Sequence, residues 1–426
     1  MAKVIKKKTK LKRLSTKEEL ELSDKSELID KILRLEAYNV QLQTILRKNE
    51  TKQMEQTKNF NETKKQFDFT KCHKRHILLK FYYLGWDYDG FICQEGSSNT
   101  VEDYLFFALI KSCFIESREK SNYHRCGRTD KGVSAFSQVI SLDIRSKLEP
   151  EKQNDLQNEL PYCKILNRLL PQNIKCIAWS PVPSDFSARF NCKNRTYKYI
   201  FPRGKLNIDA MNKAVKYAIG SHDFRNICKM DVANGVVNFE RRIIDATVSV
   251  KQNDCIQNSG YDMCELKITS HAFLWHQIRC LMGVLLLVGK EKEKPEIILK
   301  LLDINSNPCK PQYNLACEIP LNLYHSEYEN IKWFYDENDL VNVIKILQKD
   351  WSINAVKSAM IKDMLMDLEN IQNCSDTTFQ DNCLLLGANT KVYQPLMERI
   401  TCESLENKIK HYEKKHKLES MNLNST

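Results

Sequence analysis

Alternating apolar and polar residues predict several strands that each bury one face. Ile77, Leu79, Phe81 and Tyr83 recur at every second position, as expected for a half-buried strand. The same period recurs in residues 138–145, 244–250 and 264–268. In the second of these segments Ile244 is expected to face the core, on the side opposite Asp245.

Apolar residues at helical spacing predict helices between these strands. Thr100 and Asp103 form the pattern of a capping box before an apolar helix at residues 104–115. A second helix is expected at 211–219, followed by Gly220. The apolar run at 273–289 is too short to span a bilayer and includes Arg279, so it is expected to be a buried helix of the core.

Strands with one apolar face, interspersed with helices, predict an α+β fold. The sheet is expected to be mostly antiparallel, with the helices on one face. The other face would then be free to line a cleft.

Both ends of the chain differ in character from this central region. Residues 3–13 hold seven basic side chains and no acid, typical of a nuclear-import signal, of a phosphate-binding arm or of a solvated tail. A polar linker is expected over 49–70, and a helical extension with a disordered tail over 337–426. Between the arm and the linker, residues recur at the spacing of a coiled-coil seam, namely Leu28, Ile32, Leu35, Asn39, Leu42 and Leu46. A single amphipathic helix fits this spacing equally well.

Charge and cysteine usage narrow the possible partners. The 426-residue chain has 65 Lys and Arg against 54 Asp and Glu, a formal charge of +11, which favours a polyanionic partner. Its 16 cysteines are scattered and no C-x-x-C pair occurs, so a zinc site is not expected. A zinc-dependent nucleobase deaminase is excluded on the same ground.

The segment with the clearest chemistry is the loop before the strand at 138–145. Gly127 and Gly132 bracket Arg128, Thr129 and Asp130, which allows the main chain to approach a ligand closely. An arginine and an aspartate two residues apart can serve one pocket. A surface turn with an ordinary ion pair is the alternative.

The string CGRTDKGVSAFSQVISLDIRS, at 126–146, resembles the catalytic loop and following strand of the TruA family of tRNA pseudouridine synthases. The resemblance extends over about residues 75–336. Further blocks that carry it are YLGWDYDGF (83–91), RTYKYIF (195–201), SHDFRNICKMD (221–231), FLWHQIRCLMGVLLLVGK (273–290) and PQYNLACEIPLNLY (311–324). The particular residues in these blocks are similar to those of the eukaryotic branch of the family, which acts at tRNA positions 38 and 39. Lys131 and Ser134 depart from bacterial members, while the Gly-Arg-Thr-Asp core is intact.

This resemblance implies an isomerase that converts uridine to pseudouridine without a metal or an organic cofactor. It assigns Asp130 as the catalytic carboxylate and Arg279 as the cation that keeps it ionised. Tyr197 would contact the flipped base, and Arg128 would fill or guard the space that the base leaves. A catalytically silent tRNA-binding or folding factor on the same fold is the alternative.

The resemblance also implies two similar halves whose sheets form one platform, with the active cleft between them. The expected organisation is 1–70 for the arm, helix and linker, 71–188 and 189–336 for the two halves, and 337–426 for the extension. Arg189, Arg195 and Lys198 would bind phosphates of the anticodon arm. A homodimer in the nucleus and cytoplasm, with no membrane partner, completes the expectation.

Overall fold

The structure is a computed structural model that describes residues 24, 28–29, 67–94, 96–252, 260–372, 384–386 and 392–413. The chain divides into two units, Met1–Asp68 and Phe69–Thr426, and the architecture below is that of the second. The predicted basic arm, the coiled-coil spacing beyond Leu28, nearly all of the linker and the last thirteen residues lie outside the described residues.

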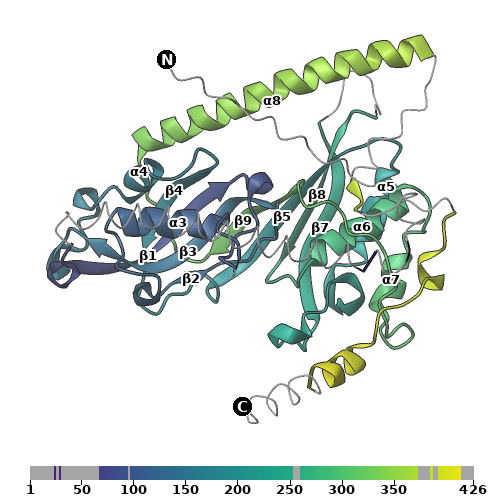
Figure 1. Cartoon of the computed structure of the whole chain (residues 1–426), viewed down its shortest axis with the longest axis horizontal. Coiled ribbons are helices and arrows are strands. Elements are labelled where there is room, and N and C mark those ends of the chain that lie inside the picture. Colours follow the sequence, from purple (N-terminus) through teal and green to yellow (C-terminus); the bar gives the residue numbers. More distant parts are fainter. Residues whose placement is uncertain are drawn as a thin grey trace. The chain divides into compact units, whose positions relative to one another are not determined.

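The predicted α+β fold with a mostly antiparallel sheet is confirmed (Figure 1). The described strands form a nine-stranded sheet in the order β4-β1-β3-β9-β5-β8-β7-β6, with β2 beside β3. They are β1 (His73–Tyr83), β2 (His124–Arg125), β3 (Ser134–Ser146), β4 (Ile174–Pro181), β5 (Cys192–Pro202), β6 (Gly220–Asp223), β7 (Glu240–Gln252), β8 (Met263–Ser270) and β9 (Leu321–Tyr328).

The centre of the sheet is formed by β9, which joins the half built on β1, β3 and β4 to the half built on β5 to β8. Strand β9 pairs antiparallel with β5, but parallel with β3 over only Ser134 and Ala135. Side chains reinforce this short contact. Asn322 Oδ1 accepts a hydrogen bond from the Phe136 N–H (3.0 Å), and Ser326 Oγ donates to the Ser137 carbonyl (2.8 Å).

Helices from both halves pack their apolar residues into one continuous core with the sheet. They are α3 (Val101–Lys111), α4 (Tyr162–Asn167), α5 (Ile208–Lys216), α6 (Gln277–Gly289) and α7 (Ile297–Leu302). The predicted capping box is confirmed at the start of α3, because Thr100 caps the Asp103 N–H and Asp103 reaches back to the Thr100 N–H. As expected for a core helix, α6 is buried along its whole length.

The expectation for Ile244 is wrong. Ile243 is buried, whereas Ile244 is 41% exposed. A register shift between Ile243 and Asp245 in the pairing of β7 with β8 reverses which residue faces the core at this end of the strand. Beyond the bulge, Ala246 and Val248 are buried as predicted.

A long helix, α8 (Glu337–Gln372), follows the sheet. Ala355, Lys362 and Glu369 are partly buried at seven-residue spacing, and Glu369 accepts a hydrogen bond from Tyr261 at 2.5 Å. At 3.6 residues per turn, the opposite side of the helix is apolar and exposed. We call it the outer stripe of α8; it consists of Ile353, Val356, Met360, Met364, Leu368 and Ile371. No helix among the described residues is both long and apolar enough to cross a membrane.

Candidate active site

The loop that carries Asp130 leads into β3 at the centre of the sheet, and main-chain hydrogen bonds fix its path. The Phe91 N–H donates to the Thr129 carbonyl, and the Gly132 N–H donates to the Tyr88 carbonyl, both at 3.2 Å. The segment around residues 85–91 therefore forms a cradle that holds the loop through its backbone.

Two glycines make this close approach possible. A Cβ on Gly85 would lie 1.9 Å from the Val133 carbonyl oxygen, which is far inside contact distance. Gly90 has a φ of +107°, and a Cβ there would meet the Thr129 carbonyl oxygen at 3.2 Å. A side chain at either position would displace the backbone beside Asp130.

Two side chains at the start of α6 contact the Asp130 carboxylate, which is distant from them in sequence. His276 Nε2 lies 3.3 Å and Arg279 Nη1 lies 3.9 Å from Asp130 Oδ2. The same guanidinium contacts Glu318 Oε2 at 2.7 Å and donates from Nε to the Ala316 carbonyl at 2.9 Å. Two partners on its own half, Glu318 and Ala316, thus fix Arg279. Of its two carboxylate partners, Asp130 is the more distant.

The electrostatic balance at Asp130 is unfavourable for its charge. Burial raises the pKa of this carboxyl above its ordinary 3.8, with a smaller contribution from the Glu318 carboxylate. Arg279, a hydrogen bond from Trp275 and the charge of Lys229 act in the opposite direction. The carboxylate side chain nevertheless keeps 29% of its surface accessible, so a ligand can reach it.

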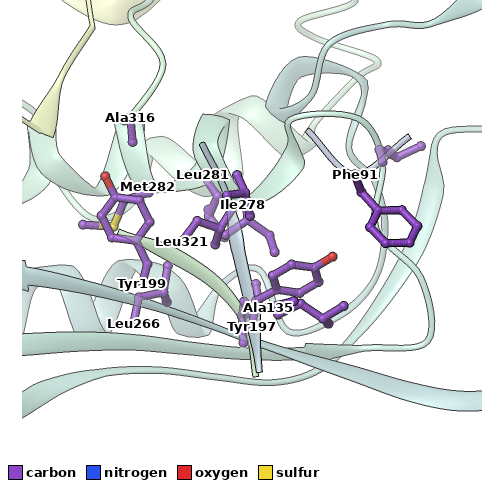
Figure 2. Packing of buried hydrophobic residues seen from close by; sticks show 14 of the residues in the cluster. Phe91, Ala135, Tyr197, Tyr199, Leu266, Ile278, Leu281, Met282, Ala316 and Leu321 are labelled. Atoms are coloured by element: carbon purple, nitrogen blue, oxygen red, sulfur yellow. The ribbon is translucent and has the colours of Figure 1, made fainter. Parts of the chain in front are cut away.

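Tyr197 lies close to the loop on β5. Figure 2 shows its side chain beside Ala135 and Ile278, on the same side of the strand as Tyr199. The rings of Tyr197 and Phe273 form a T-shaped contact with their centres 5.2 Å apart, which fixes the Tyr197 ring. Burial raises the pKa of Tyr197 well above its ordinary value, so the phenol stays protonated at neutral pH.

This arrangement corrects the expectation that the helix-free face of the sheet lines the cleft. Asp130 contacts Arg279 near the start of α6, and the Tyr197 ring lies beside Ile278 of the same helix (Figure 2). The charged end of α6 supplies Arg279, so the candidate site lies on the helix-bearing side. Asp130, Arg279 and Tyr197 therefore all lie on the side of the sheet that α6 covers.

The predicted arginines Arg128 and Arg189 are both exposed. Within the part of the chain that the structure describes, Arg128 has no ion-pair partner, although it is only two residues from Asp130. Arg189 lies over the ring of Phe190 at 5.3 Å, and that ring is itself 76% exposed. Both arginines are accessible to a large ligand.

Arg195 is placed differently from what the sequence led us to expect. Arg195 is buried, and its guanidinium donates to the Cys126 carbonyl at 2.8 Å, to the Arg189 carbonyl at 3.0 Å and to the His271 carbonyl. A phosphate could bind this group only after these bonds break. It therefore ties the Asp130 loop to neighbouring segments.

Lys198 follows Tyr197 in β5, so its side chain leaves the opposite face of the sheet. Its Nζ lies 3.2 Å from Glu265 and 4.0 Å from the centre of the Tyr324 ring. The structure does not bring Lys198 to the Asp130 site.

Sequence reasoning did not single out His276, Trp275 or Glu318 as site residues. The first two stand in the same Trp-His-Gln-Ile-Arg run as Arg279, and a helical turn from Arg279 back to His276 was a usable signal. Glu318 occurs in the segment before β9, where nothing in the pattern connected it with Arg279. In the described ranges, no group of three or more His, Cys, Asp or Glu side chains is placed to hold a metal ion.

Comparison with known proteins identifies similar chains. A family model described as tRNA pseudouridine synthase matches residues 214–329. The chain is 45% identical over 392 residues to a tRNA pseudouridine(38/39) synthase of Bos taurus, covering 84% of this chain and 81% of that protein. Proteins of the same name are 43% identical in Homo sapiens, covering 85% and 82%, and 40% identical in Saccharomyces cerevisiae, covering 74% and 72%.

We expect Asp130→Asn to raise the free energy of unfolding at pH 7. An unfolded aspartate titrates near 3.8, whereas the folded Asp130 holds its proton to higher pH, so the folded state loses stability as the pH rises through that interval. The neutral amide removes this loss.

The measurement is chemical denaturation of both proteins between pH 3.5 and 8. The gain in free energy of unfolding of Asp130→Asn over the wild type should be complete above the pKa of folded Asp130. It should vanish below the ordinary aspartate pKa. A variant less stable than the wild type at pH 7 would contradict the unfavourable balance at Asp130.

Proposed function

The chain belongs to the family of tRNA pseudouridine synthases, which isomerise uridine in tRNA, and we propose that it acts at positions 38 and 39 in the anticodon arm with Asp130 as nucleophile. The names of its bovine, human and yeast relatives support the positions. The observation that carries the role of Asp130 is its accessible carboxylate, 3.9 Å from the Arg279 guanidinium at the junction of the two halves.

The reaction breaks the bond between ribose C1′ and uracil N1, turns the base and rejoins it through C5. It needs a group that adds and then leaves, and a carboxylate can do both. A bound nucleotide would exclude water from Asp130, which further disfavours the ionised form. Arg279 offsets this effect, because its guanidinium is held in place by Glu318 and cannot turn away.

The target uridine is stacked in RNA and must leave the stack to reach Asp130. Tyr197 supplies a platform for the extruded base, since Phe273 fixes its ring and its hydroxyl remains protonated. Arg128 is exposed on the loop itself and is suited to the space that the base leaves. Arg189 retains the proposed role in phosphate binding, whereas the bonds of Arg195 argue against that role for it.

The outer stripe of α8 supports the homodimer. Six exposed apolar side chains on one side of a helix form a surface that water solvates poorly. We assign a second copy of this chain to it, so that one tRNA can rest on two subunits.

We also propose that the protein works in the nucleus and the cytoplasm. The seven basic residues at 3–13 support nuclear import, and tRNA is available in both compartments.

Purified protein should convert unmodified tRNA at positions 38 and 39 without added metal or nucleotide. Asp130→Ala should lower the conversion rate at least about 10³-fold, because the attacking group is lost. Pseudouridine mapping by chemical labelling and primer extension measures both. Binding of tRNA without conversion by the wild type would favour the silent RNA-binding factor instead.

Arg128→Ala and Arg189→Ala should separate base extrusion from phosphate binding. If Arg128 stabilises the extruded state, its loss lowers kcat about 10–100-fold, with unfolding stability within about 0.5 kcal/mol of the wild type. Arg189→Ala should instead raise KM and reduce the slope of log Kd against log salt concentration by about one. If both variants changed only KM and to the same extent, Arg128 would have no separate role in stabilising the extruded base.

The double variant Met360→Glu, Met364→Glu should shift the protein from dimer to monomer, because it places charges in the centre of the outer stripe. Sedimentation equilibrium measures the mass against the 49.9 kDa of one chain. Ser358→Glu, an exposed polar position on the flank of the same helix, is the control and should remain dimeric. A wild-type mass of one chain at micromolar concentration would refute the dimer.

A further inference from the structure

His276 adopts a backbone conformation that its position does not favour. It is the residue before α6, with φ 57° and ψ 11°, in the left-handed region that side chains other than glycine rarely enter. Helix starts favour Ser, Thr, Asp or Asn, whose side chains cap the first turn, but the His276 side chain makes no capping bond. Backbone strain and a missing cap both occur where the ring points to Asp130.

The two ring nitrogens of His276 have different surroundings. Nε2 faces Asp130 Oδ2 at a distance of 3.3 Å. Nδ1 is buried without a hydrogen-bond partner. If the proton were on Nδ1, a buried N–H would lack an acceptor and Nε2 would present a lone pair to the Asp130 carboxylate. With the proton on Nε2, only a lone pair on Nδ1 is left without a partner, which costs less free energy. The proton therefore belongs on Nε2.

The charges around the ring keep it neutral. Burial lowers the pKa of His276 to about 4, and the positive charges of Arg279, Lys229 and Lys310 act in the same direction. Glu318 opposes them weakly. His276 is thus a donor that carries no charge of its own, on the side of Asp130 that faces α6.

We propose that His276 is a positioning residue that donates from Nε2 to Asp130 Oδ2 and so orients the carboxylate toward the nucleotide. This inference rests on the proposed role of Asp130 as nucleophile. The hydrogen bond stabilises the ionised carboxylate and fixes its rotation, so the two oxygens are no longer equivalent. Arg279 stabilises the charge of the same oxygen from a greater distance, whereas His276 fixes the orientation of the carboxylate.

The test compares His276→Asn with His276→Gln in kinetics on unmodified tRNA between pH 5 and 9. Asn tolerates the left-handed backbone but is too short to reach Asp130, whereas Gln carries an N–H at about the distance of Nε2. We expect His276→Asn to lower kcat about 10–100-fold with little change in KM, as for the loss of one hydrogen bond to a charged group.

The pH profile distinguishes positioning from a merely structural role. Without the donor the pKa of Asp130 rises further, so the acid limb of kcat/KM should move up by about one pH unit in His276→Asn. The other groups facing Asp130, namely Arg279, Trp275, Glu318 and Lys229, are unchanged in the variant. His276→Gln should restore most of the rate and return the acid limb toward the wild-type position.

Asp130→Ala in the same assay separates this inference from the proposed function. Conversion by Asp130→Ala would overturn the nucleophile, and the role of His276 with it. An inactive Asp130→Ala together with wild-type kcat and acid limb in His276→Asn would overturn the positioning role alone. Equal loss in the Asn and Gln variants would also overturn it, because only Gln keeps the donor.

Discussion

The insertion of β9 between the two halves is the constraint on which the site depends. Asp130 belongs to the first half and Arg279 to the second. Among the described strands, those of the two halves pair with β9 but not directly with each other. β9 pairs with β3 beside the Asp130 loop and with β5 beside Tyr197. Glu318, three residues before β9, holds the guanidinium of Arg279. A strand from late in the chain thus sets the distance between the acid and the cation.

The charge balance of the site leaves the largely buried carboxylate of Asp130 without a close, fully compensating cation. Arg279 lies closer to Glu318 than to Asp130, so the charge of Asp130 is only partly compensated. A tighter pair would stabilise the protein and would also occupy the oxygen that the proposed mechanism needs. Unfavourable burial is typical of groups that react, and the fold supplies the stability elsewhere, in the continuous core beneath α6.

Local patterns were sufficient for most elements but not for the direction of every side chain. Period-two alternation predicted β1, β3, β7 and β8, and the capping box located α3, because these signals act between neighbours in sequence. The bulge that exposes Ile244 depends on pairing with β8, which alternation does not encode. Arg195 was misjudged because its acceptor at Cys126 is 69 residues away.

The candidate site was predictable only in part for the same reason. Asp130 stood out through its flanking glycines, and Arg279 and Tyr197 through family resemblance. Neither route indicates that His276 takes a left-handed backbone or that Glu318 holds Arg279. Such features arise from tertiary contacts between segments that are distant in sequence.

The glycine cradle beneath the Asp130 loop has a consequence for how such a loop can diverge. The cradle recognises main-chain atoms of the loop, and Lys131 points outward to an exposed ion pair with Asp89. Exposed side chains of the loop can therefore be substituted without changing the path of its backbone. Gly85 has no such freedom, since even one added methyl group would meet the Val133 carbonyl. Substitutions that look mild in sequence can therefore be the most damaging to this loop.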